Sequence, residues 1–453
     1  MSDPAEVRTT NEDATESAPP AYFLSLTVGN FRCFGPQQTL DLSDGKGRPA
    51  RWTVVLGENG VGKTSLLQCL AALQPERGRV IKDQTVYFIG THVAPVQQFL
   101  YSLLSTREKS KAYFSISSAI YYGAKLTHAA KGKVTRQLSV ASTSSNSYSR
   151  SGTLENVQGL ICYGYGATRR IGKTSLSDRR DMFPSASLFY DTAELLNPEE
   201  WLLQADYAAI RQTRRRIRAL RRRDQIKQVL LRLLPDVVDL RFSQSDEETF
   251  APSVEAKTPY GWVRIQDLSL GYVTLISWIV DFASRLIDRY PSSNNPLAEP
   301  AVVLVDEIDL HLHPKWQRQL TSFLCEIFPN TQFIVTAHSP LVVQSAVDAN
   351  IVLLRREGDH VVIDNNVEAV KNWRVDQVLT SDLFGLESAR PPELDTALAE
   401  RQRILSKGKL TRGDEKKLQD LEAQIGNLPV GETPEDMQAM DIVRRAAELL
   451  RNQ

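Results

Sequence analysis

Apolar residues and turn residues alternate near the start of the chain in a pattern that predicts short strands. From Tyr22 the segment YFLSLTVGNFRCF is followed by TLDL and then by WTVVLG, which ends at Gly57. Runs rich in β-branched and aromatic residues, bounded by turn residues, are typical of strands. After Thr64 the run SLLQCLAAL has helical spacing and good helix formers. The sequence therefore predicts the order strand, glycine-rich loop, helix.

Three later segments repeat the design of an apolar strand that ends in polar residues. They are LICYGYGATRR at 160–170, AVVLVDE at 301–307 and TQFIVTAHSP at 331–340. Continuous apolar strands of this kind are typical of parallel sheets that are buried on both faces. The strand GWVRI and the helical run LGYVTLISWIVDFASRLIDRY, which stops at Pro291, precede the second of them. We expect an α/β fold with a mixed sheet flanked by helices.

Changes in pattern along the chain predict five regions. Residues 198–234 are helical in pattern, with Asn197 as a cap and Pro198 in the first turn. Residues 131–159 lack apolar periodicity, which favours a flexible loop or an irregular strand pair. After Val367 the pattern is helical, with caps at Thr411 and Thr433. The predicted regions are a disordered tail (1–20), an N-terminal lobe part (21–170), an inserted helical subdomain (171–260), a C-terminal lobe part (261–366) and a helical region (367–453).

Composition narrows the partners and the compartment. The 453 residues hold 54 Lys plus Arg and 54 Asp plus Glu, so net charge gives no global attraction to nucleic acid or membrane. The four cysteines match neither a disulfide framework nor a zinc site, which favours a reducing compartment. The most apolar stretch, at 275–282, is far shorter than the roughly 20 residues of a membrane span. We expect a cytoplasmic protein that does not bind membranes.

The segment GENGVGKT has the spacing of a phosphate-binding loop between a strand and a helix. Its glycines let backbone amides converge on phosphates, Lys63 supplies a positive charge, and Thr64 offers a hydroxyl to Mg²⁺. The alternative is a glycine turn that happens to precede Lys and Thr. The expected ATP-binding residues are Gly57, Glu58, Asn59, Gly60, Val61, Gly62, Lys63, Thr64 and Ser65.

Two acids follow the apolar strand that begins at Ala301. Asp306 is placed to hold Mg²⁺ together with Thr64, and Glu307 is placed to orient or deprotonate water. Adjacent carboxylates at a strand end are unfavourable unless a cation or a water network uses them. The alternative is that the two acids cap the following helix.

Two further motifs stand at equivalent places. His338 in TAHSP follows another buried strand and is expected to act as a γ-phosphate sensor, although a lone histidine is more often structural. Ser269 and Gly271 in LSLGY precede the long apolar helix, where a hydroxyl and free amides can bind an anion. A Ser-x-Gly cap before a helix is common, so this signal depends on the others.

An arginine run, RQTRRRIRALRRRD, extends from Arg211 to Asp224 and is the strongest local charge feature. Eight arginines in thirteen positions of a helix cannot share one face. One interpretation is a solvated or acid-paired helix. The other is a surface for nucleic acid or an acidic partner, in which phosphate contacts would dominate through Arg211 to Arg223.

Together these motifs resemble the ABC-type ATPase superfamily, in the SMC, RecF and OLD-like branch that includes bacterial AAA family ATPases. The resemblance covers roughly Tyr22 to Asn366 and includes an NFR-x-F element made by Asn30, Phe31, Arg32 and Phe34. It identifies 57–64 as the Walker A motif, Asp306 and Glu307 as Walker B, 309–313 as the D-loop, and His338 as the switch histidine. It also places Arg32 near the nucleotide. LSLGY resembles the signature motif but has Leu270 where the family has glycine.

The resemblance implies a P-loop NTPase fold of the ABC-ATPase type that binds ATP and Mg²⁺ and hydrolyses ATP. It implies a homodimer or higher oligomer in which Ser269 and Gly271 of one copy face the P-loop of another. The architecture is most similar to stand-alone ATPases of anti-phage defence, of the Septu and retron-associated types, which act with an effector such as a nuclease. The alternative is a DNA-binding ATPase of genome maintenance like RecF or SMC; the motor of a transporter fits less well.

Overall fold

A computed structural model describes most of the chain. The chain divides into two compact units, 1–378 and 379–453. The described residues are 20–76, 80–81, 84–85, 88–89, 113–122, 126, 132–141, 160–172, 183–210, 216–234, 236–243, 252–346, 348–367, 370, 373–407 and 410–425. The predicted tail (except residue 20), all of 142–159, Arg211, Arg214, Arg215 and the Thr433 cap lie outside them.

A six-stranded sheet forms the centre of the first unit, with the strand order β10-β16-β17-β3-β18-β19. Every neighbouring pair is parallel except β18 and β19. The strands are β10 (Cys162–Tyr165), β16 (Ala301–Val305), β17 (Thr331–Thr336), β3 (Trp52–Gly57), β18 (Asn350–Glu357) and β19 (His360–Asp364). β16 and β17 are buried at every position, as the continuous apolar pattern predicts. The expected α/β fold is confirmed.

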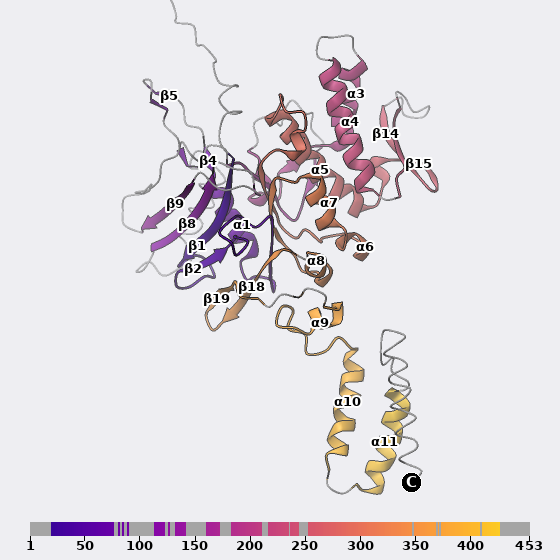
Figure 1. The fold of residues 1–453 in the computed structure, drawn as a ribbon. Coiled ribbons are helices and arrows are strands. Elements are labelled where there is room, and N and C mark those ends of the chain that lie inside the picture. Colours follow the sequence, from indigo (N-terminus) through magenta and orange to yellow (C-terminus); the bar gives the residue numbers. More distant parts are fainter. Residues whose placement is uncertain are drawn as a thin grey trace, which may run out of the picture. The chain divides into compact units, whose positions relative to one another are not determined.

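A second, antiparallel sheet has the order β2-β1-β8-β9 (Figure 1). Its strands are β1 (Ala21–Gly29), β2 (Gln38–Asp41), β8 (Tyr113–Tyr122) and β9 (Gly132–Ala141). β9 pairs with β8 over its whole length, so a regular strand occupies the start of the segment expected to be a loop or an irregular strand pair. The buried Gln332 side chain joins the two sheets, because its amide accepts from Phe23 N at 2.9 Å and donates to Phe23 O at 2.8 Å.

Helices complete the layers of the first unit (Figure 1). α1 (Lys63–Ala72) buries Leu66, Leu67 and Leu70 in one core with residues of both sheets. α5 (Leu270–Arg289) buries Trp278 and Phe282, whose rings contact those of Tyr165 and Tyr163 of β10 in tilted and edge-to-face geometry. The other helices are α3 (Pro198–Ile210), α4 (Arg216–Leu233), α6 (Pro314–Gln317), α7 (Leu320–Ile327), α8 (Pro340–Ser345) and α9 (Val375–Leu379), with short η4 (Ala186–Leu188), η5 (Ile265–Asp267) and η6 (Pro296–Ala298).

The α3–α4 hairpin is followed by a small sheet of β13 (Asp239–Ser243), β14 (Ser253–Thr258) and β15 (Gly261–Arg264). Asn197 caps α3 as expected, because its Oδ1 accepts from Glu199 N at 3.0 Å. Two-residue strands also form three pairs: β4 (Pro75–Glu76) with β7 (Phe88–Ile89), β5 (Val80–Ile81) with β6 (Gln84–Thr85), and β11 (Arg170–Ile171) with β12 (Glu194–Leu195). α5 is long and apolar enough to cross a membrane, but 72% of its most apolar window is buried inside the protein.

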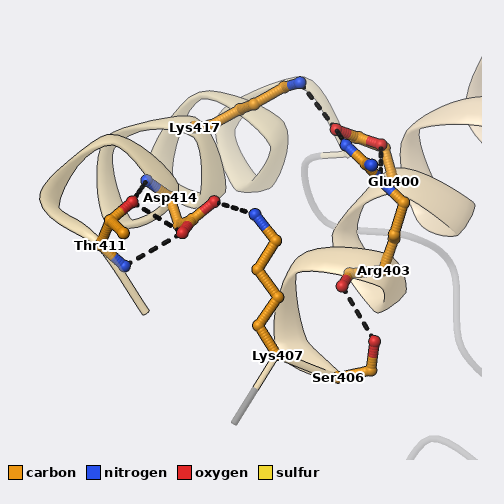
Figure 2. A network of polar contacts seen from close by, with 7 residues as sticks. All are labelled: Glu400, Arg403, Ser406, Lys407, Thr411, Asp414 and Lys417. Atoms are coloured by element: carbon orange, nitrogen blue, oxygen red, sulfur yellow. Dashed lines mark hydrogen bonds and ion pairs between the residues drawn. The ribbon is translucent and has the colours of Figure 1, made fainter. Parts of the chain in front are cut away.

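The second unit contains a helical hairpin of α10 (Pro392–Leu405) and α11 (Arg412–Ile425). Figure 2 shows its polar network, in which Glu400 accepts from Arg403 at 2.8 Å and from Lys417 at 2.7 Å. These bonds lower the pKa of Glu400 to about 2, with the larger effect from Arg403. Because the pKa in the folded state lies below the unfolded value, this pairing stabilises the hairpin above about pH 4.5 and is lost as the pH falls toward 2.

The predicted cap at Thr411 forms a reciprocal capping box at the start of α11. Asp414 N donates to Thr411 Oγ1 at 3.2 Å, and Thr411 N donates to Asp414 Oδ2 at 3.0 Å. We predict that Thr411→Ala in the intact chain makes amide hydrogen exchange in the first turns of α11 roughly fivefold faster. Thr396→Ala is the matched control, because among the described residues the Thr396 hydroxyl bonds to the Pro392 carbonyl within its own helix α10. Equal exchange in α11 of both variants would contradict this role.

Candidate functional site

Three neighbouring strands of the central sheet end side by side and bring the predicted motifs together. Val305 of β16 is paired with Val335 of β17, which is paired with Val54 of β3. One residue beyond this row come Asp306 and Thr336, and β3 continues into the glycine-rich loop. Parallel strands present their carboxyl ends at one edge, where ligands of α/β proteins bind. The sheet register therefore places segments more than 240 residues apart at one site.

The glycine-rich loop needs glycine where the chain passes close to its neighbours. Gly57 has φ 142° and Gly62 has φ 90°, which residues with a Cβ rarely adopt. A Cβ on Gly57 would lie 2.7 Å from the Leu354 carbonyl oxygen, and one on Gly62 would lie 2.6 Å from Cys33 Sγ. Gly60, with φ 81°, has open space around it. The loop is thus packed at both ends and open at its middle.

Lys63 is 7% exposed and lies under the loop that it follows. Its Nζ donates to the carbonyls of Gly57 and Glu58, each at 2.8 Å. Burial lowers the pKa of Lys63, and the nearby charges of Asp306 and Glu307 partly offset this. A buried ammonium at the mouth of the loop is suited to an anionic ligand.

The Asp306 carboxylate is held from both sides. Thr64 Oγ1 at the start of α1 donates to Asp306 Oδ2 at 2.6 Å, and Thr336 Oγ1 at the end of β17 donates to Asp306 Oδ1 at 2.6 Å. A hydroxyl and a carboxylate side by side are the oxygen ligands that Mg²⁺ prefers. Thr64 and Asp306 therefore fit the predicted metal role.

Glu307 has a strained backbone, with φ 47°. A residue with a side chain in the left-handed region costs about 1–3 kcal/mol, so its surroundings must hold it there. Glu307 N donates to Thr336 Oγ1 at 2.7 Å, and Arg169 Nη2 donates to the Glu307 carbonyl at 2.7 Å. Such strain is typical of functional sites.

Arg169 is a site residue that the sequence motifs did not single out. It is 3% exposed and donates through Nη2 to the carbonyls of both Asp306 and Glu307. Burial lowers its pKa to about 10, and the charges of Asp306, Asp309 and Glu307 oppose this change. The guanidinium therefore stays positive at neutral pH. The segment GATRR contained a partial signal, since it follows a buried strand, but the sequence does not show that this strand lies beside the one that carries Asp306.

Arg32, which the resemblance places near the nucleotide, contacts the first turns of α1. Its Nη1 donates to Ser65 Oγ at 2.7 Å and to Gln68 Oε1 at 3.2 Å. The turn that carries it closes through Phe31 and Phe34, whose backbones exchange two hydrogen bonds. The Phe34 side chain packs beneath Gly62, so the turn and the loop are held together.

His338 and the D-loop are joined through the backbone. His338 N donates to both oxygens of Asp309, at 3.2 and 3.1 Å, and the His338 side chain is exposed. Gln317 ties the same region together, because it donates to the Asp309 and Leu312 carbonyls and accepts from Ser339. A shift of the D-loop would thus move His338.

The residues expected to form the signature motif lie at the start of α5. Ser269 and Leu270 are exposed, and Leu270 retains 64% of its surface. Gly271 packs against the D-loop, because a Cβ there would lie 2.3 Å from the His311 carbonyl oxygen. The structure gives Gly271 a contact within its own chain that the signature motif did not predict.

The described part of the arginine run is partly paired with acids. Arg222 forms an ion pair with Asp288, and Arg223 contacts Asp206 at 2.7 Å. Arg216 and Arg218 at the start of α4 are exposed. The run therefore combines an acid-paired part with a solvated part.

Known proteins resemble this chain over the same region. The family described as "AAA domain, putative AbiEii toxin, Type IV TA system" matches residues 52–344. The Septu protein PtuA of Bacillus mycoides (strain KBAB4) is 26% identical over 372 residues, 81% of this chain and 45% of that protein. "Retron Vc95 probable ATPase" of Vibrio cholerae serotype O1 biovar El Tor is 47% identical over 92 residues, 20% of this chain and 18% of that protein.

The alignments span less than half of the length of these two relatives. Among solved structures, an SMC head bound to the C-winged helix domain of ScpA aligns with 76% of this chain and 97% of its own, at 16% identity and a TM-score of 0.43.

We predict that Gly271→Ala destabilises the first unit by about 1–3 kcal/mol, because the new methyl group would collide with the His311 carbonyl. Denaturant unfolding of the intact chain measures the change. Gly413→Ala is the matched control, since a Cβ there meets its nearest atom at 3.8 Å. A Gly271→Ala chain as stable as the control would show that the D-loop does not rest on α5.

Proposed function

The chain belongs to this AAA-domain family, and on that premise we propose that it binds ATP with Mg²⁺ and hydrolyses it to ADP and phosphate. The observation that carries the proposal is the Thr64–Asp306–Thr336 hydrogen-bond set, which lies between the glycine-rich loop and Glu307. Phosphoryl transfer requires a loop that binds phosphates, carboxylates that hold a metal ion and orient water, and a positive charge, and the glycine-rich loop, Asp306 with Glu307, and Lys63 can supply them.

In this proposal the loop binds the phosphates of ATP. The amides of 57–64 at the start of α1 surround them, and Lys63 Nζ exchanges its carbonyl partners for the β and γ oxygens. Thr64 and Asp306 hold Mg²⁺, which neutralises charge on the phosphates when it is bound. Arg32 fixes the first turn of α1 through Ser65.

Glu307 acts as the general base. Its carboxylate takes a proton from water while the water oxygen bonds to the γ-phosphorus, and the bond from that phosphorus to the β–γ bridging oxygen breaks. ADP and phosphate are the products. His338 hydrogen-bonds to the γ-phosphate as a sensor, and the bond between its backbone and Asp309 transmits the loss of that phosphate to the D-loop.

Two copies of the chain associate around ATP. Ser269 and Gly271 at the exposed start of α5 bind the nucleotide held by the P-loop of another copy, as the resemblance to ABC-type ATPases implies. ATP-dependent association then regulates a protein effector, such as a nuclease, in anti-phage defence. The similarity to a Septu protein and a retron ATPase supports this role.

A DNA-binding ATPase like RecF or SMC is the second candidate, favoured by the exposed Arg216 and Arg218. The ion pairs of Arg222 and Arg223 weaken it, because paired charges are less available to phosphates. This alternative would be supported if the chain binds duplex DNA with an affinity that falls steeply as the salt concentration rises, and if the double variant Arg216→Ala, Arg218→Ala loses that affinity.

We predict that Glu307→Gln slows hydrolysis by on the order of 100-fold or more and leaves ATP bound, so that the associated state accumulates. Light scattering with size-exclusion chromatography, with and without Mg-ATP, gives the oligomer size. We expect an increase with ATP that is larger in Glu307→Gln than in the parent chain.

Lys63→Ala in the Glu307→Gln background is the control, because it removes the positive charge that holds ATP and should abolish the increase. Hydrolysis at the parent rate in Glu307→Gln would exclude Glu307 as the base. The same oligomer size with and without Mg-ATP would exclude ATP-dependent association.

A further inference from the structure

Arg169 donates a hydrogen bond to the carbonyl of Glu307, the residue whose backbone is in the left-handed conformation. The backbone N–H of Glu307 donates to Thr336 Oγ1 of β17, and the backbone carbonyl of Glu307 accepts from Arg169 Nη2 in the loop after β10. The two bonds come from the strands on either side of β16. The left-handed turn of Glu307 is thereby held from both neighbours.

The Arg169 side chain is committed to backbone carbonyls. Nη2 donates to Asp306 O as well as to Glu307 O, whereas the buried Nε has no hydrogen-bond partner among the described residues. A buried guanidinium with an unpartnered donor is unfavourable, so an arginine here needs a reason beyond packing.

The backbone of Arg169 is anchored close to Walker B. Tyr165 at the end of β10 accepts from Asp306 N at 2.8 Å, and β11 begins directly after Arg169 and pairs with β12. Arg169 itself has φ 38°, a second strained residue facing the first. The guanidinium is therefore aimed at the 306–307 turn by fixed elements on both sides.

We propose that Arg169 is a positioning residue that holds Glu307 in its left-handed conformation and so aims the carboxylate at the attacking water. The inference rests on the proposed function, in which Glu307 is the general base. Without the bond from Arg169, the Glu307 peptide relaxes toward ordinary φ values and its carboxylate leaves the line of attack. ATP binding by the glycine-rich loop does not use this bond.

Arg169→Met, which removes the donors and keeps an unbranched side chain, tests the proposal in the intact chain. We expect kcat to fall on the order of 100-fold, with the equilibrium dissociation constant of Mg-ATP changed less than about threefold. Arg170→Met is the matched control, since Arg170 is the exposed neighbour, and it should keep the parent kcat. An unchanged kcat in folded Arg169→Met would overturn the proposal.

A double-mutant cycle separates positioning from a general structural role. In the Glu307→Gln background the same Arg169→Met change should lower the residual hydrolysis less than about twofold, because the base it positions is already gone. A further 100-fold loss there would show that Arg169 acts on something other than Glu307. Hydrolysis at the parent rate in Glu307→Gln would instead defeat the proposed role of Glu307 as the base, whatever Arg169→Met does.

Arg169→Lys covers the case in which the methionine variant does not fold. It keeps the buried cation but has a shorter side chain without the planar fork, so we expect about a tenfold lower kcat at parent ATP affinity. A kcat of Arg169→Lys equal to that of the parent chain would overturn the positioning role. Failure of both variants to fold would also overturn it, because it would show that Arg169 is needed for the stability of the chain.

Discussion

The placement of Asp306 is the constraint on which the rest of the site depends. Its carboxylate accepts from Thr64 at the start of α1 and from Thr336 at the end of β17, and its carbonyl accepts from Arg169 beyond β10. These bonds join three other segments of the chain to the end of β16. Because a buried carboxylate is unfavourable without partners, the two threonine bonds to it also stabilise the sheet edge. Fold and site are thus parts of one arrangement.

The sequence predicted the parts of the site whose chemistry is local. Gly57, Lys63 and Thr64 could be recognised because eight consecutive residues determine the loop. The predicted sheet is confirmed by the strand topology. The predicted resemblance is confirmed by the matching family and by the similarity to a Septu protein and a retron ATPase. Arg169 and Thr336 could not be assigned, since their roles depend on which strands lie beside β16. Sequence spacing carries no information on that register.

The D-loop connects the two ends of the proposed mechanism. Asp309 holds the backbone of His338, and the carbonyl of His311 rests on Gly271 at the start of α5. A partner copy that engages α5 would therefore press on the segment that follows Glu307. Leu270 is 64% exposed beside Gly271, so the start of α5 presents an apolar side chain to solvent.

Magnesium-linked ATP binding tests the central claim most directly, that Thr64 and Asp306 form the metal-holding part of an ATP site. Calorimetric titration of ATP, with Mg²⁺ and with a chelator, should show tighter binding with Mg²⁺ in the parent chain. In Asp306→Asn that gain should disappear, because one carboxylate ligand is lost while the glycine-rich loop remains. An equal gain from Mg²⁺ in both chains would contradict the account.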